Sequence, residues 1–121
     1  MADIGTLVAT LFLARDVAHR EHLKTRSYSA HMALGDFYAG VIELADSLAE
    51  TYQGHFNKLI DIPLLDAPKD TPIAEFLAGQ HEWICDARYE AVPKDETAIQ
   101  NIIDEIEALY MSTLYKLRFL S

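Results

Sequence analysis

The spacing of apolar residues most constrains how this chain can fold. Apolar side chains recur at the three- and four-residue spacing of an amphipathic helix in four segments. They predict helices over about 3–23, 27–53 and 72–89, and from Asp95 nearly to the C-terminus. Strand patterns are almost absent. Because 121 residues suffice for one core and are too few for two ordinary domains, we expect a single all-α domain over residues 1–121.

The unequal connections between these segments narrow the topology. Two are short, whereas residues 55–71 contain Pro63, Pro68 and turn-forming aspartates, and Gly54 is expected to end the second helix. A connection of this length can run along a whole helix. It allows the second and third helices to be parallel, as in ferritin-like four-helix bundles with one crossover. Its apolar residues predict that it lies over the bundle: Leu59, Ile60, Ile62, Leu64 and Leu65.

Composition excludes several classes of function. A formal net charge of −9 argues against a general affinity for nucleic acid, which requires a basic surface. No apolar stretch is long enough to span a membrane, and residues 7–14 lack the basic leader of a signal peptide. The one cysteine, Cys85, cannot form an internal disulfide, so we expect a reducing cytoplasm and a buried thiol that acts as a small apolar side chain.

Side chains able to bind a metal gather around the second predicted helix. His19 and His22 end the helix before it, His31 lies in its first turns, and Asp46 and Glu50 lie near its end. Mixed imidazole and carboxylate ligands suit iron(II), and also zinc or manganese. However, at 1.5 Å per residue, His31 and Asp46 are roughly 22 Å apart on one helix. A site built from both therefore requires two copies of the chain.

An antiparallel pairing of two copies of this helix brings the groups together. Matching His31 to the turn that carries Asp46 and Glu50 places the two-fold axis near Ala39 and Gly40, whose small side chains let two backbones approach. One copy would supply imidazoles. The other would supply the two carboxylates, which lie four residues apart on one helical face. We expect a homodimer or larger homo-oligomer with two equivalent sites.

The run from His19 to Gly54 resembles the ligand-bearing helices of Dps proteins, the mini-ferritins, and more closely those of small Dps-like proteins of tailed phages. In Dps proteins a histidine is followed by a second after twelve residues, an aspartate after fifteen more and a glutamate after a further four. His19, His31, Asp46 and Glu50 keep these spacings. The local context of the first ligand favours His22 instead, so both His19 and His22 stay candidates.

The resemblance implies a ferritin-like bundle, an iron site between subunits, oxidation of iron(II) by peroxide or oxygen, and a hollow oligomer, often a dodecamer. One position departs from the family pattern. The carboxylate expected four residues after the second histidine falls on Gly35, with Asp36 one place away as a possible ligand. The chain is also shorter than typical Dps proteins and lacks a basic tail, so DNA binding is not carried over.

Two other hypotheses remain from the sequence. The chain could be a non-catalytic helical oligomer of a phage, with a structural role or an acidic surface that engages a host protein in the host cytoplasm. An acidic DNA mimic is a third idea, but it requires carboxylates concentrated on one face. Among other residue types, Tyr28, Tyr38 and Tyr52 fit a core or an interface, whereas His55 and His81 fit a loop and a helix surface.

Overall fold

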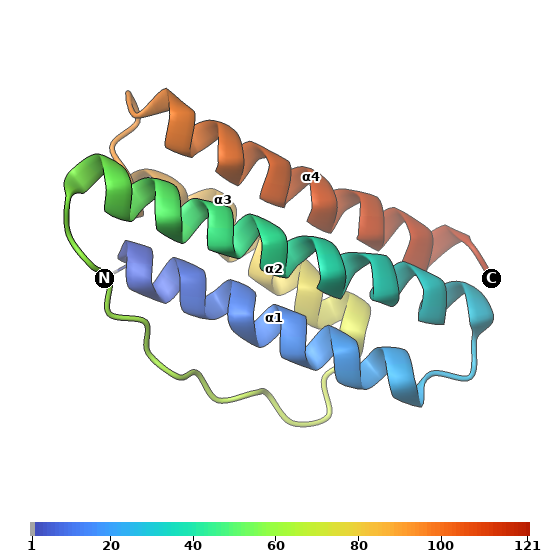
Figure 1. Ribbon diagram of the computed structural model, residues 1–121. Coiled ribbons are helices and arrows are strands. Elements are labelled where there is room, and N and C mark those ends of the chain that lie inside the picture. The colour runs from blue at the N-terminus through green and yellow to red at the C-terminus, as the bar shows by residue number, and fades with distance from the viewer. Residues whose placement is uncertain (1) are drawn as a thin grey trace.

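Four helices make up most of the chain in the computed structural model, which describes residues 2–121 (Figure 1). They are α1 (Ile4–Lys24), α2 (Tyr28–Phe56), α3 (Ile73–Ala91) and α4 (Thr97–Phe119). Helices α1 and α4 each contact both α2 and α3. The expectation of an all-α four-helix bundle is confirmed, and no strand occurs in residues 2–121.

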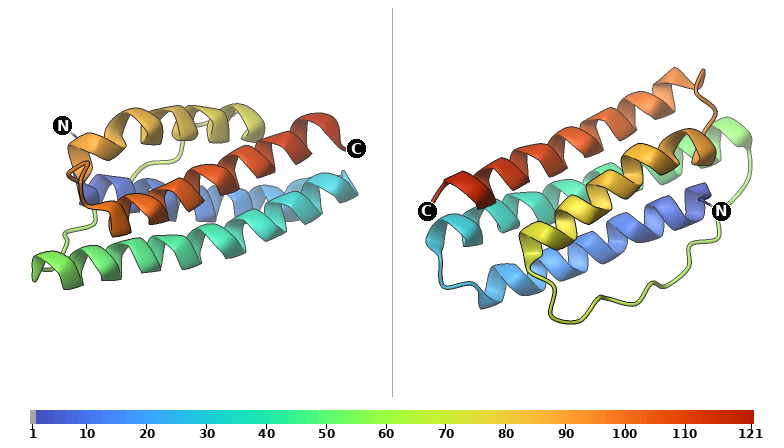
Figure 2. Two further views of the ribbon diagram at one scale, coloured as in Figure 1. Left: turned by 90° about the horizontal axis from the view of Figure 1, so that it is seen from above. Right: turned by 180° about the vertical axis from the view of Figure 1, so that it is seen from behind.

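Helices α2 and α3 run in the same direction because residues 57–72 cross back along the length of the bundle (Figures 1 and 2). Each helix is antiparallel to the two neighbours that it contacts. This is the topology of a bundle with one long crossover, as the length of the connection predicts.

Short polar side chains cap the N-termini of the first two helices. The Asp3 carboxylate accepts a hydrogen bond from the Thr6 backbone N–H at 2.8 Å, which lowers the pKa of Asp3. The Ser27 hydroxyl accepts one from the Ala30 N–H at 3.2 Å. These contacts fix the two ends of the bundle from which α1 and α2 start.

Two predicted helix ends were wrong. Helix α2 does not stop at Gly54 but continues to Phe56, and it ends at Asn57, whose φ of 53° lies in the left-handed region. Helix α4 begins at Thr97, after Glu96 and without a side-chain cap, and not at Asp95 as expected.

The crossover covers the bundle only in part. Ile60 packs against the core and its backbone N–H donates to the Gln53 side chain at 2.9 Å, but Leu59 and Leu64 are 87% and 101% exposed. An extended segment resting on helices has one side facing solvent, so it cannot bury every apolar side chain. At Gly5 a Cβ would collide with the carbonyl oxygen of Asp61, so the absence of a side chain lets α1 meet the crossover.

The core lies between all four helices and includes a buried chain of hydrogen bonds. The Tyr110 hydroxyl donates to the Gln80 side-chain oxygen at 2.9 Å, and the Gln80 amide donates to the Thr10 carbonyl at 3.2 Å. Burial raises the pKa of Tyr110, so it stays a donor. Within residues 2–121, no helix has both the length and the hydropathy that crossing a membrane requires. The fully buried apolar side chains of the core include Leu7, Leu11, Leu34, Phe37, Leu48, Leu77, Ile84, Ile99, Ile103 and Ile106.

Candidate functional site

Three histidines of the predicted metal site meet where α1 ends and α2 begins. The His22 and His31 rings stack with centroids 3.7 Å apart, and His19 stacks on Tyr38 at 4.1 Å. The His19 and His22 centroids are 6.2 Å apart. All three imidazoles are half-buried. The fold therefore stacks His22 on His31 and places His19 beside His22, but the ligand atoms of the three histidines do not all lie within 4.8 Å of one another.

Two reciprocal contacts fix the His22–His31 pair. The Nδ1 of His22 lies 2.6 Å from the carbonyl oxygen of His31, and the Nδ1 of His31 lies 2.8 Å from the carbonyl oxygen of His22. Because a carbonyl oxygen can only accept a hydrogen bond, both Nδ1 atoms carry the proton and donate it. In the neutral rings, the Nε2 atoms keep their lone pairs. This is the tautomer in which histidine binds a metal through Nε2 while a carbonyl orients the ring.

Gly35 occupies the position where the Dps pattern has a carboxylate, and the structure gives a reason for the glycine. A Cβ at this position would lie 3.1 Å from Cε1 and 3.3 Å from Nδ1 of His22. The space that a side chain would fill holds the His22 imidazole instead. The neighbouring Asp36 is exposed and lies 4.0 Å from the ammonium of Lys116 on α4.

The two remaining predicted ligands lie on the exposed face of α2. Asp46 and Glu50 are both exposed, and they belong to no group of metal-binding residues formed within residues 2–121. The structure thus places the histidines together and leaves these carboxylates available to another molecule. Ala39 is exposed near the middle of the same helix, whereas Gly40 faces α4, where a Cβ would lie 3.2 Å from the Leu109 side chain.

The other aromatic and histidine candidates have separate environments. Tyr52 is buried, Tyr38 forms the stack on His19, and Tyr28 is 77% exposed. His55 lies in the last turn of α2, where its Nε2 contacts the carboxylate of Glu96.

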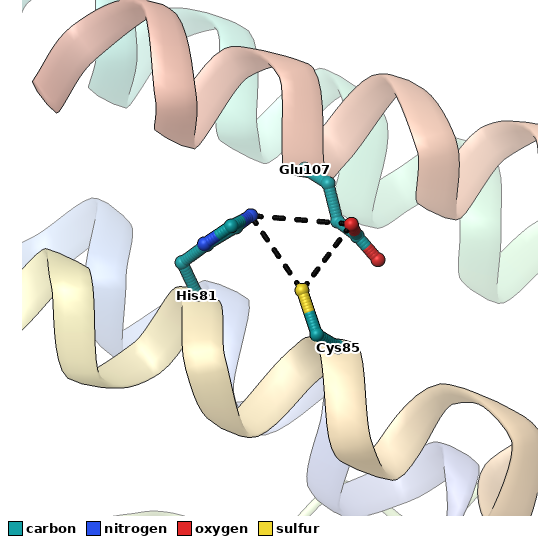
Figure 3. Close-up of side chains that lie close together, drawn as sticks. All are labelled: His81, Cys85 and Glu107. Carbon is teal, nitrogen blue, oxygen red and sulfur yellow. Dashed lines mark hydrogen bonds and ion pairs between the residues drawn. The ribbon is translucent and has the colours of Figure 1, made fainter. Parts of the chain in front are cut away.

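Sequence reasoning missed a second cluster, formed by His81 and Cys85 on α3 and Glu107 on α4 (Figure 3). The Cys85 sulfur lies 3.3 Å from Oε1 of Glu107 and 3.6 Å from Nε2 of His81. The His81 nitrogen and the Glu107 oxygen are 3.9 Å apart. Cys85 is half-buried among polar groups and is not the buried apolar side chain expected. The four-residue spacing of His81 and Cys85 was a usable signal, but Glu107 enters only through the packing of α3 on α4.

Arg88 holds the carboxylate of this cluster from the other side. Its guanidinium donates to Oε2 of Glu107 at 2.7 Å, to Asp104 at 2.8 Å and to the side chain of Gln100 at 2.8 Å. Arg88 is buried, and although burial works to lower its pKa, the bonds to Asp104 and Glu107 outweigh this and raise it. Burial, with the hydrogen bond to Glu107, raises the pKa of the Cys85 thiol to about 11. The free thiol is therefore protonated at neutral pH and donates to Glu107.

The chain belongs to a family of unknown function, DUF5856, whose model matches residues 22–117. The matched region contains both histidines of the stacked pair, the predicted ligands Asp46 and Glu50, and the cluster between α3 and α4. It begins after His19. Neither the curated proteins nor the solved structures compared with this chain include a match.

Proposed function

We propose that this member of the DUF5856 family binds iron(II) at sites shared between two antiparallel copies of α2. The observation that carries the proposal is the His22–His31 pair, which is oriented by two backbone carbonyls and leaves both Nε2 atoms available. Asp46 and Glu50 of the second copy would complete each site. The spacing of His31, Asp46 and Glu50 resembles that of Dps proteins, although the first histidine of that pattern would fall on His19 and not on His22. The crossover topology agrees with a ferritin-like bundle.

The donor set fits a divalent ion. Imidazole nitrogen with carboxylate oxygen and open coordination positions suits iron(II), with zinc or manganese as alternatives. Iron(II) bound with an open coordination position would be oxidised there by peroxide or oxygen. The metal is then the substrate of the reaction. The task of the protein residues is to bind and orient it. His22 takes the space left by Gly35, so the site would be richer in nitrogen than the Dps pattern that it resembles.

Charge on α2 supports a contact that depends on metal. The helix carries Asp36, Glu43, Asp46 and Glu50 and contains no lysine or arginine. All four carboxylates are exposed. Two such faces repel each other unless cations lie between them. Bound metal would therefore stabilise the dimer, and dimer formation would complete the sites.

Anaerobic titration of the metal-free chain with iron(II), followed by sedimentation, tests this function. We expect dimers to form as iron binds, and His31→Gln or Asp46→Asn to weaken binding at least tenfold. Glu105→Gln, which removes an exposed carboxylate from α4, is the matched control and should bind as the unchanged chain does. Equal iron binding by the unchanged chain and both site variants would reject the proposal.

A second candidate function, a non-catalytic helical oligomer, is favoured by apolar side chains at one end of the bundle. Tyr28 and Met32 on α2 are 77% and 47% exposed, and Met111, Tyr115 and Phe119 on α4 are 51%, 55% and 75% exposed. Exposed apolar groups on neighbouring helices are typical of a surface that contacts protein. An oligomer that survives metal chelation and is dissociated by Tyr115→Ser with Phe119→Ser would favour this function over iron binding.

A further inference from the structure

We infer that His81, Cys85 and Glu107 form a second metal site, which takes a single zinc-like divalent ion and lies wholly within one chain. It is separate from the shared iron site by position and by ligand chemistry. The three side chains come from α3 and α4, whereas the proposed iron ligands come from α1 and α2.

The geometry of the three ligand atoms suits one ion. Their separations are 3.3, 3.6 and 3.9 Å (Figure 3). Around tetrahedral zinc, bonds of about 2.3 Å to sulfur and about 2.0–2.1 Å to nitrogen or oxygen place the ligand atoms about 3.3–3.6 Å apart. The point in the plane of the observed triangle that is equidistant from its corners is about 2.1 Å from each. A tetrahedral ion lies out of that plane, so the His81–Glu107 separation has to shorten from 3.9 Å towards about 3.3 Å. An ion can therefore enter with ligand movements of a few tenths of an ångström.

The positions of the ligands follow from the helices that carry them. His81 and Cys85 are four residues apart, so they lie one turn apart on the same face of α3. Glu107 reaches them from α4 with Oε1, while Oε2 stays bonded to Arg88. In many metal sites a carboxylate binds the metal through one oxygen and accepts a hydrogen bond from another side chain through the other.

The charge and burial of the cluster also favour a divalent ion over an empty site. The Cys85 thiolate, Glu107 and Asp104 carry three negative charges against the one positive charge of Arg88, so together they balance a divalent ion, and the neutral imidazole completes three ligands. The side chains of His81 and Glu107 are 21% and 16% exposed, so an ion has access from solvent and a water molecule can fill the fourth position. Sulfur among the ligands favours zinc or cobalt over magnesium or calcium.

Binding at this site releases a proton. In the metal-free chain the Cys85 thiol donates to Glu107, so the ion displaces the thiol proton to solvent and forms a bond to the thiolate. The cysteine stays at the same oxidation level. Affinity should therefore increase with pH, by up to tenfold per pH unit between pH 6 and 8.

Cobalt(II) titration of the full, metal-free chain with a non-thiol reductant tests the site. We expect one cobalt per chain with a thiolate-to-cobalt charge-transfer band and the visible spectrum of tetrahedral cobalt, both abolished by an equal amount of zinc. Cys85→Ser should remove the charge-transfer band, and His81→Gln and Glu107→Gln should each weaken binding at least tenfold.

Circular dichroism of each variant shows whether it is folded, and Cys85→Ser is close in volume to the original residue. His31→Gln is the matched control, since it alters the other cluster and should leave the cobalt spectrum unchanged. The absence of a charge-transfer band in the unchanged chain would overturn the inference. The inference would also be overturned if folded His81→Gln and Glu107→Gln bound cobalt as tightly as the unchanged chain and showed the same band, because the thiol would then bind cobalt without the other two ligands.

Discussion

The two histidine-containing clusters differ in how their ligands are held and in how many chains they need. At the end of α1, His22 and His31 hold each other through backbone carbonyls, and their proposed carboxylate partners are exposed on the distant half of α2. Between α3 and α4, by contrast, nitrogen, sulfur and oxygen ligands already lie within 4.8 Å of one another. In the assignments that we propose, the first cluster is half a site, and the second is nearly complete.

The difference shows two ways in which a small bundle can prepare a metal site. Hydrogen bonds to backbone orient the imidazoles of the first cluster but leave its charge balance to a partner. The second cluster has its own balance, because Arg88 neutralises Glu107 in the metal-free chain. We therefore expect metal binding to be coupled to chain association at the first cluster and to be independent of it at the second.

Removing Arg88 should have the largest effect, since it would weaken the second cluster and leave the first unchanged. Arg88→Met leaves Glu107 and Gln100 without their shared donor, so we expect a loss of about 3 kcal/mol in the free energy of unfolding. Cobalt affinity at the second cluster should fall about 10- to 100-fold, because Glu107 is no longer oriented. Urea unfolding and cobalt titration measure the two effects.

Arg20→Met is the control for this change. Its guanidinium is 76% exposed in an ion pair with Asp16, so the free energy of unfolding should change by less than about 0.5 kcal/mol. Similar losses in the two variants would mean that the bonds made by Arg88 do not hold α3 against α4.

A methyl group at Gly35 should disturb the first cluster alone. Alanine in place of a helical glycine usually gains about 0.5–1 kcal/mol, and Gly79→Ala, where nothing lies within 4 Å of the new Cβ, should show that gain. Gly35→Ala should instead lose about 0.5 kcal/mol, because the new Cβ presses on the stacked His22 ring.

The cause can be isolated by a second substitution. In a His22→Ala background the space beside position 35 is free, so Gly35→Ala should recover the helical gain in thermal or urea unfolding. If Gly35→Ala stabilises the unchanged chain as much as Gly79→Ala does, the imidazole does not need the space.

Alkaline pH should destabilise the second cluster alone, and by less than the loss of Arg88 does. The folded pKa of Cys85 is about 11, above the unfolded value near 8.5, so folding favours the protonated thiol. Its contribution is complete below about pH 8.5 and is lost as the pH rises towards 11. Allowing for solvent screening, we expect the metal-free chain to lose about 1 kcal/mol more than Cys85→Ser between pH 8 and pH 10. Identical pH profiles for the two chains would contradict this.

The bundle could be predicted from sequence because the four apolar stripes and the long connection are local patterns. The C-terminal end of α2 could not, since Gly54 is a common helix stop, whereas in the structure the helix continues to Phe56 and is capped by Asn57. Likewise the crossover's apolar composition does not reveal that Leu59 and Leu64 face solvent.

The two clusters also differ in how far each could be predicted from the sequence. The meeting of His19, His22 and His31 could be foreseen, because a short turn joins the helices that carry them. Their need for a partner follows from helix length alone. Glu107, however, is 22 residues from Cys85 and reaches it only through the register of α4 on α3. No local pattern fixes that register, so the second cluster required the structure.

The contrast between a shared site and a single-chain site is tested most directly by mixing inactive variants. We would refold His31→Gln with Asp46→Asn in equal amounts, both in a Cys85→Ser background, and measure anaerobic iron(II) capacity. A shared site predicts that half of the dimers are mixed and that each holds one intact site, which restores about one quarter of full capacity. Mixing His81→Gln with Cys85→Ser should restore no cobalt thiolate site. No iron capacity in the first mixture, or a restored cobalt site in the second, would contradict the assignment of the first cluster to two chains and the second to one.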